Sequence, residues 1–353
     1  MLRDSHTCTG PVREYAWANE VNGLDCRVFY HDHCFDGACS ASVFTRFHRE
    51  CIGTALEFSY VGLMHRAGAL FDEAAFVQGE NAIVDFKYSA SPRVTWWFDH
   101  HLSAFLTPDD QRDYLAWQAQ ANGDGVKAFG GKFYDPEYVS CTGLILDVAA
   151  GKFGFDVSGL AELRTWADIV DGAKYESAEA AVGMAAPAMK LTMAIESSGD
   201  GFVPRVIPLL TEMSLQEVLD QPFVQAELGP LMERHRQGIA LIRERAHLDG
   251  GVITFDITDT LTEGYNKFIP YYLLPEGTYV VGLSKSSFRV KVSVGTNPWT
   301  PLPVERLVNL AAICERYGGG GHARVGAISF PPDKEDDARK AAAEIAGELR
   351  AAE

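Results

Sequence analysis

The segment HDHCFDGACSA, residues 31–41, concentrates side chains that bind divalent cations, and it directly follows the apolar run RVFY. Two histidines, two aspartates and a cysteine lie within its first six residues. They can converge on one cation if the chain turns sharply, which Gly37 permits because it lacks a Cβ. A polar strand-to-helix turn with an aspartate cap gives the same pattern, so this segment alone leaves both interpretations open.

Aspartate and histidine also end two other apolar runs. Asp85 closes AIVD, and Asp99, His100 and His101 close VTWWFDHH. Consecutive histidines at a strand end point to different sides, so one imidazole can bind a metal while the other reaches a substrate oxygen. The preceding aspartate can orient an imidazole. A lone aspartate at a strand end is more often a cap or a turn former. Asp85 is therefore a candidate ligand only because the neighbouring apolar runs also end in Asp or His.

Two later motifs complete the candidates. ADIVDGAKY places Asp168 and Asp171 three residues apart at the end of a predicted helix, so either carboxylate can turn toward a site. Aspartates near a helix C-terminus oppose the helix dipole, which indicates a compensating cation, although a solvated helix end is the plainer alternative. In GGGGH, residues 318–322, backbone N–H groups can approach an anion and His322 can donate to it, whereas a flexible turn is the other interpretation.

The elements that must position these motifs are predicted to be α/β. Short β-rich runs alternate with helical stretches from about residue 26 to residue 170, which is typical of an open, mostly parallel sheet flanked by helices. In that architecture ligands bind beyond the carboxyl ends of the strands, and His31, Asp85 and Asp99 all stand there. The sequence therefore predicts that residues far apart in the chain meet at one edge of the sheet.

A second α/β pattern begins near Gly251, and the stretch between the two patterns has helical periodicity without a clear strand. We expect an N-terminal metal-binding domain over residues 20–190, a helical connector over 191–248 and a smaller α/β substrate-binding domain over 249–353. A chain of 353 residues is long enough for two such cores.

Composition restricts the ligand and the location. A formal net charge of −17 disfavours electrostatic capture of long nucleic acid and favours a small substrate whose phosphates are neutralised locally. Seven cysteines without a C-x-x-C pair predict reduced thiols. The sequence contains no apolar run long enough to span a bilayer, so we expect a cytoplasmic protein without a membrane segment. The oligomeric state stays open, a homo-oligomer included.

Taken in order, HDHCFDG, AIVDF, FDHH, ADIVD and GGGGH resemble the DHH phosphoesterase superfamily with its DHH-associated C-terminal domain. That group includes RecJ-like exonucleases and oligonucleotide-degrading phosphodiesterases. The resemblance covers about residues 28–330. It implies a metal-dependent hydrolase that cuts phosphate esters of short oligonucleotides, dinucleotides or a phosphorylated nucleotide. It also implies two divalent ions, manganese in the first place, with magnesium, zinc or iron as alternatives.

The resemblance assigns roles to individual residues, with Asp85 as the carboxylate that bridges the two ions. The implied metal ligands are His31, Cys34, Asp36, Asp85, His100 and Asp168. The residues implied in catalysis are Asp99, His101 and His322. The expected substrate contacts are His101, Gly319, Gly320, Gly321, His322 and the basic residues Arg289, Lys291 and Arg324. Arg289 and Lys291 alternate along SFRVKVSVG and so share one face of a strand.

Cys34 departs from the commonest pattern of these proteins, which has an aspartate two residues before the position of Asp36. A thiolate there would favour a softer ion such as zinc or iron, unless Asp32 or His33 substitutes for it. Two alternative functions follow from the same motifs. The first is a pyrophosphatase or polyphosphatase, and the second is a non-catalytic nucleotide-binding module whose first metal site has decayed.

Overall fold

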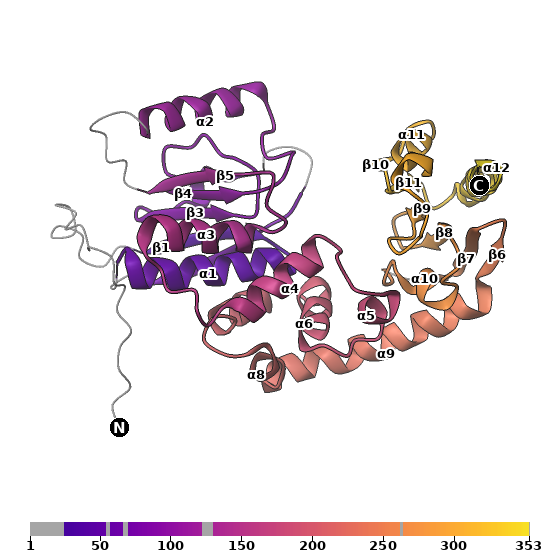
Figure 1. The fold of residues 1–353 in the computed structure, drawn as a ribbon, viewed down its shortest axis with the longest axis horizontal. Helices are drawn as coiled ribbons and strands as arrows, with labels where there is room; N and C mark the ends of the chain where they lie inside the picture. The colour runs from indigo at the N-terminus through magenta and orange to yellow at the C-terminus, as the bar shows by residue number, and fades with distance from the viewer. Residues whose placement is uncertain (1–24, 54–56, 66–69, 122–129, 262–263, 353) are drawn as a thin grey trace. The chain divides into compact units, whose positions relative to one another are not determined.

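The computed structural model describes residues 25–53, 57–65, 70–121, 130–261 and 264–352 (Figure 1). These residues form two compact units. The first unit contains the described residues up to Lys174 together with Ala186–Leu228. The second contains Tyr175–Ala185 and the described residues from Gly229 onward.

The first unit is built on a five-stranded sheet in which every pair of neighbouring strands is parallel. The order of the strands is β2-β1-β3-β4-β5. Their bounds are β1 (Cys26–His31), β2 (Phe58–Leu63), β3 (Glu80–Val84), β4 (Trp96–Asp99) and β5 (Gly131–Tyr134). The chain passes from β1 to β2 on one side and returns to β3 on the other, so the topological switch point lies between β1 and β3, where doubly wound sheets bind ligands.

Alternate residues of these strands enter two apolar layers, as the period of two along a strand requires. Phe29, Ile83 and Trp97 belong to a cluster that also contains Phe76 and Tyr88. Trp96 and Phe98 point to the other face, where they contact aromatic residues of α1 (Phe35–Cys51). The other helices of this unit are η1 (Glu73–Ala75), α2 (Pro108–Ala121), α3 (Cys141–Phe153), α4 (Ala161–Asp171), α6 (Pro187–Ser197), α7 (Val203–Val206), η2 (Ile207–Leu209) and α8 (Leu215–Leu219).

The second unit contains a six-stranded sheet of the order β10-β11-β9-β8-β7-β6, antiparallel except between β7 and β8. Its strands are β6 (His247–Asp249), β7 (Val252–Leu261), β8 (Tyr279–Lys285), β9 (Val290–Thr296), β10 (Gly320–His322) and β11 (Val325–Phe330). Its helices are α5 (Ala178–Val182), α10 (Ile269–Leu273), η3 (Val304–Arg306), α11 (Leu310–Glu315) and α12 (Glu335–Ala352). Valines of β9 alternate toward a buried core that also contains residues of α11 and α12.

The predicted α/β fold class, with a parallel sheet first, helices in the middle and a second sheet last, is confirmed. The predicted connector, residues 191–248, is largely helical, but the boundary between the units lies within it, inside α9 (Pro222–Arg245). Residues 175–185 join the second unit, where Asn266 Nδ2 and Trp299 Nε1 donate hydrogen bonds to the carbonyls of Ala181 and Tyr175.

Two expectations from composition can be compared with the structure. The thiols of Cys26, Cys34, Cys39, Cys141 and Cys314 are free, and Cys8 lies outside the described residues. Within the ranges given above, no helix has both the length and the apolar character that crossing a membrane requires.

Candidate metal centre

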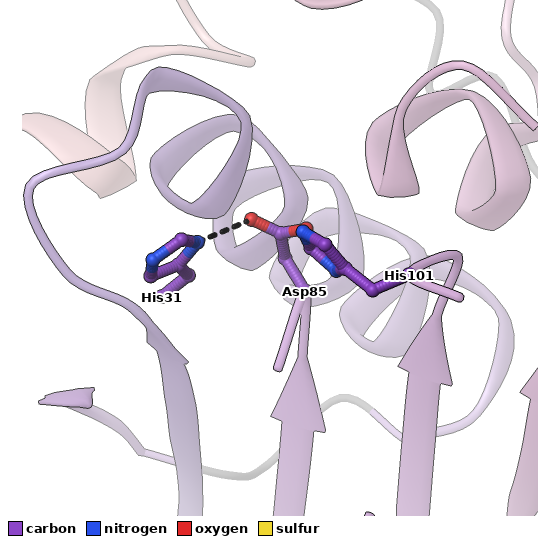
Figure 2. A group of neighbouring side chains, drawn as sticks. All are labelled: His31, Asp85 and His101. Atoms are coloured by element: carbon purple, nitrogen blue, oxygen red, sulfur yellow. Dashed lines mark ion pairs between the residues drawn. The ribbon is translucent and has the colours of Figure 1, made fainter. Parts of the chain in front are cut away.

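Six side chains of the first unit, drawn from stretches far apart in its sequence, form two neighbouring groups of candidate metal ligands. One group contains His31, Asp85 and His101 (Figure 2), and the other contains Asp36, His100 and Asp171. Within each group the ligand atoms lie within 4.8 Å of one another. Asp85 also joins the groups, because its Oδ2 lies 3.4 Å from His31 Nδ1 and its Oδ1 lies 3.4 Å from His100 Nε2.

The parallel sheet explains this convergence. His31 ends β1, Asp85 follows β3 and His100 follows β4, and these three strands are neighbours in the sheet. Their carboxyl ends therefore meet at one edge. Asp85 has a φ of +56°, a left-handed conformation that is uncommon for a residue with a Cβ, and its backbone N–H donates to Phe98 O. Such strain concentrates at functional sites.

Gly37 allows α1 to begin close behind β1. A Cβ at this position would lie 2.1 Å from the carbonyl oxygen of His31, so any larger residue would push the helix away from the strand. This close approach puts Asp36, in the first turn of α1, beside the end of the strand. The predicted role of Gly37 in the turn thus has a direct steric reason.

Asp36 is fully buried and is held by the N-terminus of another helix. Its Oδ2 accepts a hydrogen bond from Cys141 N at 2.7 Å, and its Oδ1 accepts one from Thr142 N at 3.1 Å. Both donors belong to the first turn of α3, where backbone N–H groups lack helical partners and favour an anion. Burial, followed by the charges of Asp85 and Asp171, nevertheless raises the pKa of Asp36.

His100 faces carboxylates through one fixed nitrogen. Its Nδ1 donates to the carbonyl of Tyr138 at 3.0 Å, which leaves Nε2 directed at the site. Nε2 lies 3.4 Å from oxygens of Asp85 and Asp171 and 3.8 Å from one of Asp36. Burial acts to lower the pKa of His100, but its contact with Asp85 and the three carboxylate charges raise it to about 10. Nε2 therefore needs a positive charge in front of it, either a proton or a metal ion.

Several buried polar atoms at this edge have no hydrogen-bond partner among the described residues. They are His31 Nδ1, both oxygens of Asp85, Asp99 Oδ2 and His100 Nε2. Leaving such atoms unsatisfied is costly, and an imidazole nitrogen surrounded by carboxylate oxygens is a donor set suited to a divalent cation. The residues therefore fit the metal ions that the sequence analysis expects at this position.

Asp99 orients His101. Its Oδ1 accepts a hydrogen bond from His101 Nδ1 at 2.7 Å and is also within hydrogen-bond reach of the backbone N–H groups of His100 and His101. This leaves Nε2 of His101 as the ring nitrogen available to a ligand. Burial acts to lower the pKa of His101, but the bond to Asp99 and the charges of Asp85 and Asp99 raise it.

Asp171, rather than Asp168, brings its carboxylate to the centre. The resemblance implied Asp168 as the last ligand, but Asp168 Oδ1 accepts a hydrogen bond from Ser140 Oγ at 2.5 Å and belongs to neither group. Ser140 is the N-cap of α3, so Asp168 supports the helix end that holds Asp36. Burial, followed by the charge of Asp85, raises the pKa of Asp171 to about 6. The ligand set proposed below therefore takes Asp171 in place of Asp168.

Sequence reasoning did not single out His65, which lies beside this centre. Its ring stacks on Phe86 with a centroid separation of 4.8 Å and lies 5.0 Å from the ring of His31. Burial, followed by the nearby His31, lowers the pKa of His65. The available signal was its position two residues after the apolar run that forms β2.

The candidate substrate contacts of the second unit lie along its sheet rather than at one strand end. His322 pairs with Val325 and through it with Gly295, whereas Lys291 pairs with Ser329. These two rows are four residues apart on β9, about 13 Å along the strand. Arg289 lies at the Lys291 end, where it donates to Ser329 Oγ. Arg324 lies in the turn between β10 and β11, near the His322 row.

Close packing against β11 explains part of the glycine run at residues 318–321. A Cβ on Gly319 or Gly321 would lie 2.3 or 2.2 Å from carbonyl oxygens of β11, so both positions require glycine for the hairpin to close. Gly320 has open space on the side where a Cβ would stand. Two of the glycines expected to cradle an anion are therefore explained by strand packing alone.

Comparison with known proteins supports the fold. No protein-family model matches the chain, and no curated protein is significantly similar to it in sequence. A solved structure described as the pGpG-specific phosphodiesterase PggH from Vibrio cholerae superposes with a TM-score of 0.65 at 17% identity, covering 94% of this chain and 100% of the other. A DHH domain from a member of a family of ribosomal proteins superposes with a TM-score of 0.51 at 13% identity, covering 91% and 86%. The chain thus has the fold of DHH proteins, and the predicted resemblance is confirmed at the level of the fold.

Proposed function

We propose that this chain is a metal-dependent phosphoesterase of the DHH type, which hydrolyses phosphate ester bonds in short phosphorylated nucleotides. The observation that carries the proposal is the meeting of two ligand groups around Asp85 at the switch point of the parallel sheet. Burial makes these groups expensive to assemble without a cation. The similarity of fold to a phosphodiesterase supports the same conclusion.

The proposed ligands are His31 and Asp85 at the first position and Asp36, His100 and Asp171 at the second, with Asp85 shared. We propose manganese as the ion at both positions in the simplest case, with magnesium, zinc or iron as alternatives. A bound metal pair supplies a water of lowered pKa and neutralises charge that develops on the phosphate. α3 and Tyr138 keep two of the ligands in place through the hydrogen bonds described above.

His101 is proposed to contact the substrate phosphate. Because Asp99 accepts from its Nδ1, the ring cannot rotate freely and its Nε2 keeps one direction. The raised pKa favours the protonated imidazole, which would donate to a phosphate oxygen or to the leaving oxygen. Asp99 thus serves as a positioning residue for His101.

A dinucleotide that carries a terminal phosphate is the substrate we propose, and the named neighbour acts on such a compound, pGpG. Two features of the chain support a small substrate of this kind. The net charge of −17 disfavours long nucleic acid. The rows of His322 and Lys291 lie four residues apart along β9, a spacing that suits a substrate with more than one phosphate.

The test is hydrolysis of pGpG to GMP by the full-length protein with manganese, compared with short RNA oligomers, adenosine bisphosphate and pyrophosphate. We expect turnover of pGpG and a loss of roughly 10³-fold in Asp85→Asn, because the shared ligand is removed. Asparagine tolerates the left-handed conformation of this position, so the fold should persist. The matched control is Asp220→Asn, at an exposed carboxylate outside both groups.

Turnover of Asp85→Asn within about threefold of the wild type would contradict the assigned role of this carboxylate. Preferential release of phosphate from pyrophosphate would move the chain to the pyrophosphatase alternative. Binding of pGpG without turnover of any of these compounds would support the non-catalytic module instead.

A further inference from the structure

The second unit contains a cavity of about 380 Å³ that has no part in the metal centre. Its lining comes from residues 176–179, from α10 and the turn after it, and from the segment that follows β9. All of these residues belong to the second unit, so the cavity lies within one compact body. A cavity of this volume accommodates a small organic ligand.

Aromatic rings and carboxylates dominate the lining of the cavity. Tyr271, Tyr272 and Trp299 supply the rings, and Glu176 and Glu179 supply the carboxylates, which are exposed. The lining residues include no Lys, Arg or His. Carboxylates only accept hydrogen bonds, and aromatic rings pack against flat ligands. The cavity therefore suits a flat ligand that offers N–H donors, and it does not suit an anionic group.

Hydrogen bonds hold one wall of the cavity in place. The buried Asn297 donates from its Nδ2 to the carbonyls of Pro275 at 3.1 Å and Gly277 at 2.8 Å, and its Oδ1 accepts from Trp299 N at 3.0 Å. Trp299 Nε1 donates to the carbonyl of Tyr175 at 2.9 Å. The polar atoms of both side chains are thus occupied, so Trp299 offers a ligand only its ring.

Tyr271 connects the cavity to the sheet. Its side chain is 3% exposed, and among the described residues its Oη has no hydrogen-bond partner. A Cβ on Gly295 would lie 2.8 Å from this Oη. Gly295 pairs with Val325, which pairs with His322, and paired residues project to the same face of a sheet. The unpaired hydroxyl and the imidazole therefore share one face, and Asn297 stands two residues, about 7 Å, beyond their row.

We propose that this cavity binds a guanine base of the substrate, with Glu176 and Glu179 accepting hydrogen bonds from its N1–H and N2–H groups and the rings packed against its face. Guanine presents these donors side by side on one edge. Adenine presents an acceptor at N1 instead, which a carboxylate repels. The inference rests on the proposed function for its substrate and names the base that the cavity selects.

A small organic cation is the other ligand that rings beside carboxylates attract. The neighbouring row of the sheet favours a nucleotide, because His322 is an expected phosphate contact and lies on the face that Tyr271 covers. One sugar separates a base from its phosphate, and the short step from Asn297 to this row matches that separation.

Binding of GMP and AMP to the full-length protein, kept free of metal by a chelator, tests the site without hydrolysis. Titration calorimetry should show roughly tenfold tighter binding of GMP than of AMP. Glu176→Gln and Glu179→Gln together should weaken GMP about tenfold and leave AMP unchanged, because amide donors replace acceptors opposite the donors of guanine. The matched control is Glu305→Gln, an exposed glutamate of the same unit outside the lining.

Tyr272 tests the contribution of the rings. Tyr272→Leu should weaken GMP and AMP alike by roughly tenfold, since stacking does not distinguish the bases. Tyr272→Phe keeps the ring and should bind both nucleotides as the wild type does. Tyr272 is only half-buried, and circular dichroism of the two variants checks that the fold is retained.

Three results would overturn the guanine site. They are absence of GMP binding, equal affinity for GMP and AMP in the wild type, and unchanged affinity for GMP in the double glutamine variant. Displacement of GMP is also compared with binding of spermidine, and spermidine bound in the absence of GMP binding would make the cavity a cation site. Selective binding of GMP without hydrolysis of pGpG by the manganese-loaded protein would contradict the proposed function alone.

Discussion

The two sheets of this protein place chemically capable residues in different ways. In the first unit the strands are parallel, so residues that follow β1, β3 and β4 meet at one edge although they lie far apart in the chain. In the second unit the sheet is mostly antiparallel, and the corresponding candidates are distributed along β9, β10 and β11. A parallel sheet thus concentrates ligands from distant segments into a buried centre, whereas an antiparallel sheet offers an extended face.

The difference also appears in burial and charge. Asp36 and Asp85 are fully buried, and the pKa values of the groups around them are shifted by one another. Burial acts to raise the pKa of Asp85, but its contacts with His100 and His31 hold it below its usual range. In the second unit, Lys291 is half-buried, and burial, Arg289 and Lys267 lower its pKa. The first arrangement suits tight binding of a cation, whereas contact of the second with an anionic ligand stays a prediction.

The largest loss of activity is expected from a substitution at Asp171, and Asp168 on the same helix, α4, provides the comparison. Asp171→Asn should lower turnover by roughly 10³-fold and weaken binding of the second ion, because it removes a ligand. Asp168→Asn should cost only about tenfold, since this residue acts through Ser140 and α3. Steady-state kinetics together with manganese titration of both variants measures this. Equal losses in the two variants would contradict the assignment of Asp171 as the ligand.

A smaller effect is expected from pH on metal affinity. Without metal, Asp171 has a pKa of about 6 and His100 a pKa of about 10, so both carry protons that a bound ion must displace. Manganese affinity should therefore rise with pH, by roughly a hundredfold per unit below about pH 6, where both protons are displaced, and by roughly tenfold per unit above it, where only His100 carries one, with proton release on binding. Titration calorimetry at several pH values, in two buffers of different ionisation enthalpy, measures the manganese affinity and the number of protons released. An affinity that is constant between about pH 5 and about pH 7 would contradict the electrostatics described here.

The smallest effect should come from the second unit. Lys291→Met should raise KM for pGpG about threefold to tenfold and leave kcat nearly unchanged, because a phosphate contact away from the reacting bond contributes to binding alone. Lys334→Met, at an exposed lysine of the same unit, is the matched control. Initial-rate measurements over a range of pGpG concentrations separate the two parameters. A loss in kcat without a change in KM would contradict a role of Lys291 in binding alone.

The sequence predicted the parallel sheet and most of the centre because strand ends are visible as apolar runs closed by Asp or His. His31, Asp85 and Asp99 could be placed at one edge from that pattern and from the rule for doubly wound sheets. The choice between Asp168 and Asp171 could not be made in the same way. Both lie on one face of α4, and only the position of Ser140, from another helix, decides which carboxylate is occupied.

Other features depend on contacts that sequence spacing does not encode. The hydrogen bonds from the N-terminus of α3 to Asp36 depend on the packing of α1 against α3. The stacking of His65 on Phe86 depends on the register of β2 beside β1. In the second unit the run of glycines suggested an anion cradle. That role stays a prediction, and Gly319 and Gly321 are in addition needed for the approach of β11. The boundary between the units could also not be predicted from the sequence, because α9 continues without a break across it.

The central claim is that Asp85 is shared by two metal ions, one beside His31 and the other among Asp36, His100 and Asp171. A crystal structure of the full-length protein soaked in manganese, with anomalous scattering to locate the ions, tests it most directly. We expect two ions about 3.5 to 4 Å apart with a carboxylate oxygen of Asp85 bound to each. A single ion, or ions bound without Asp85, would contradict the account.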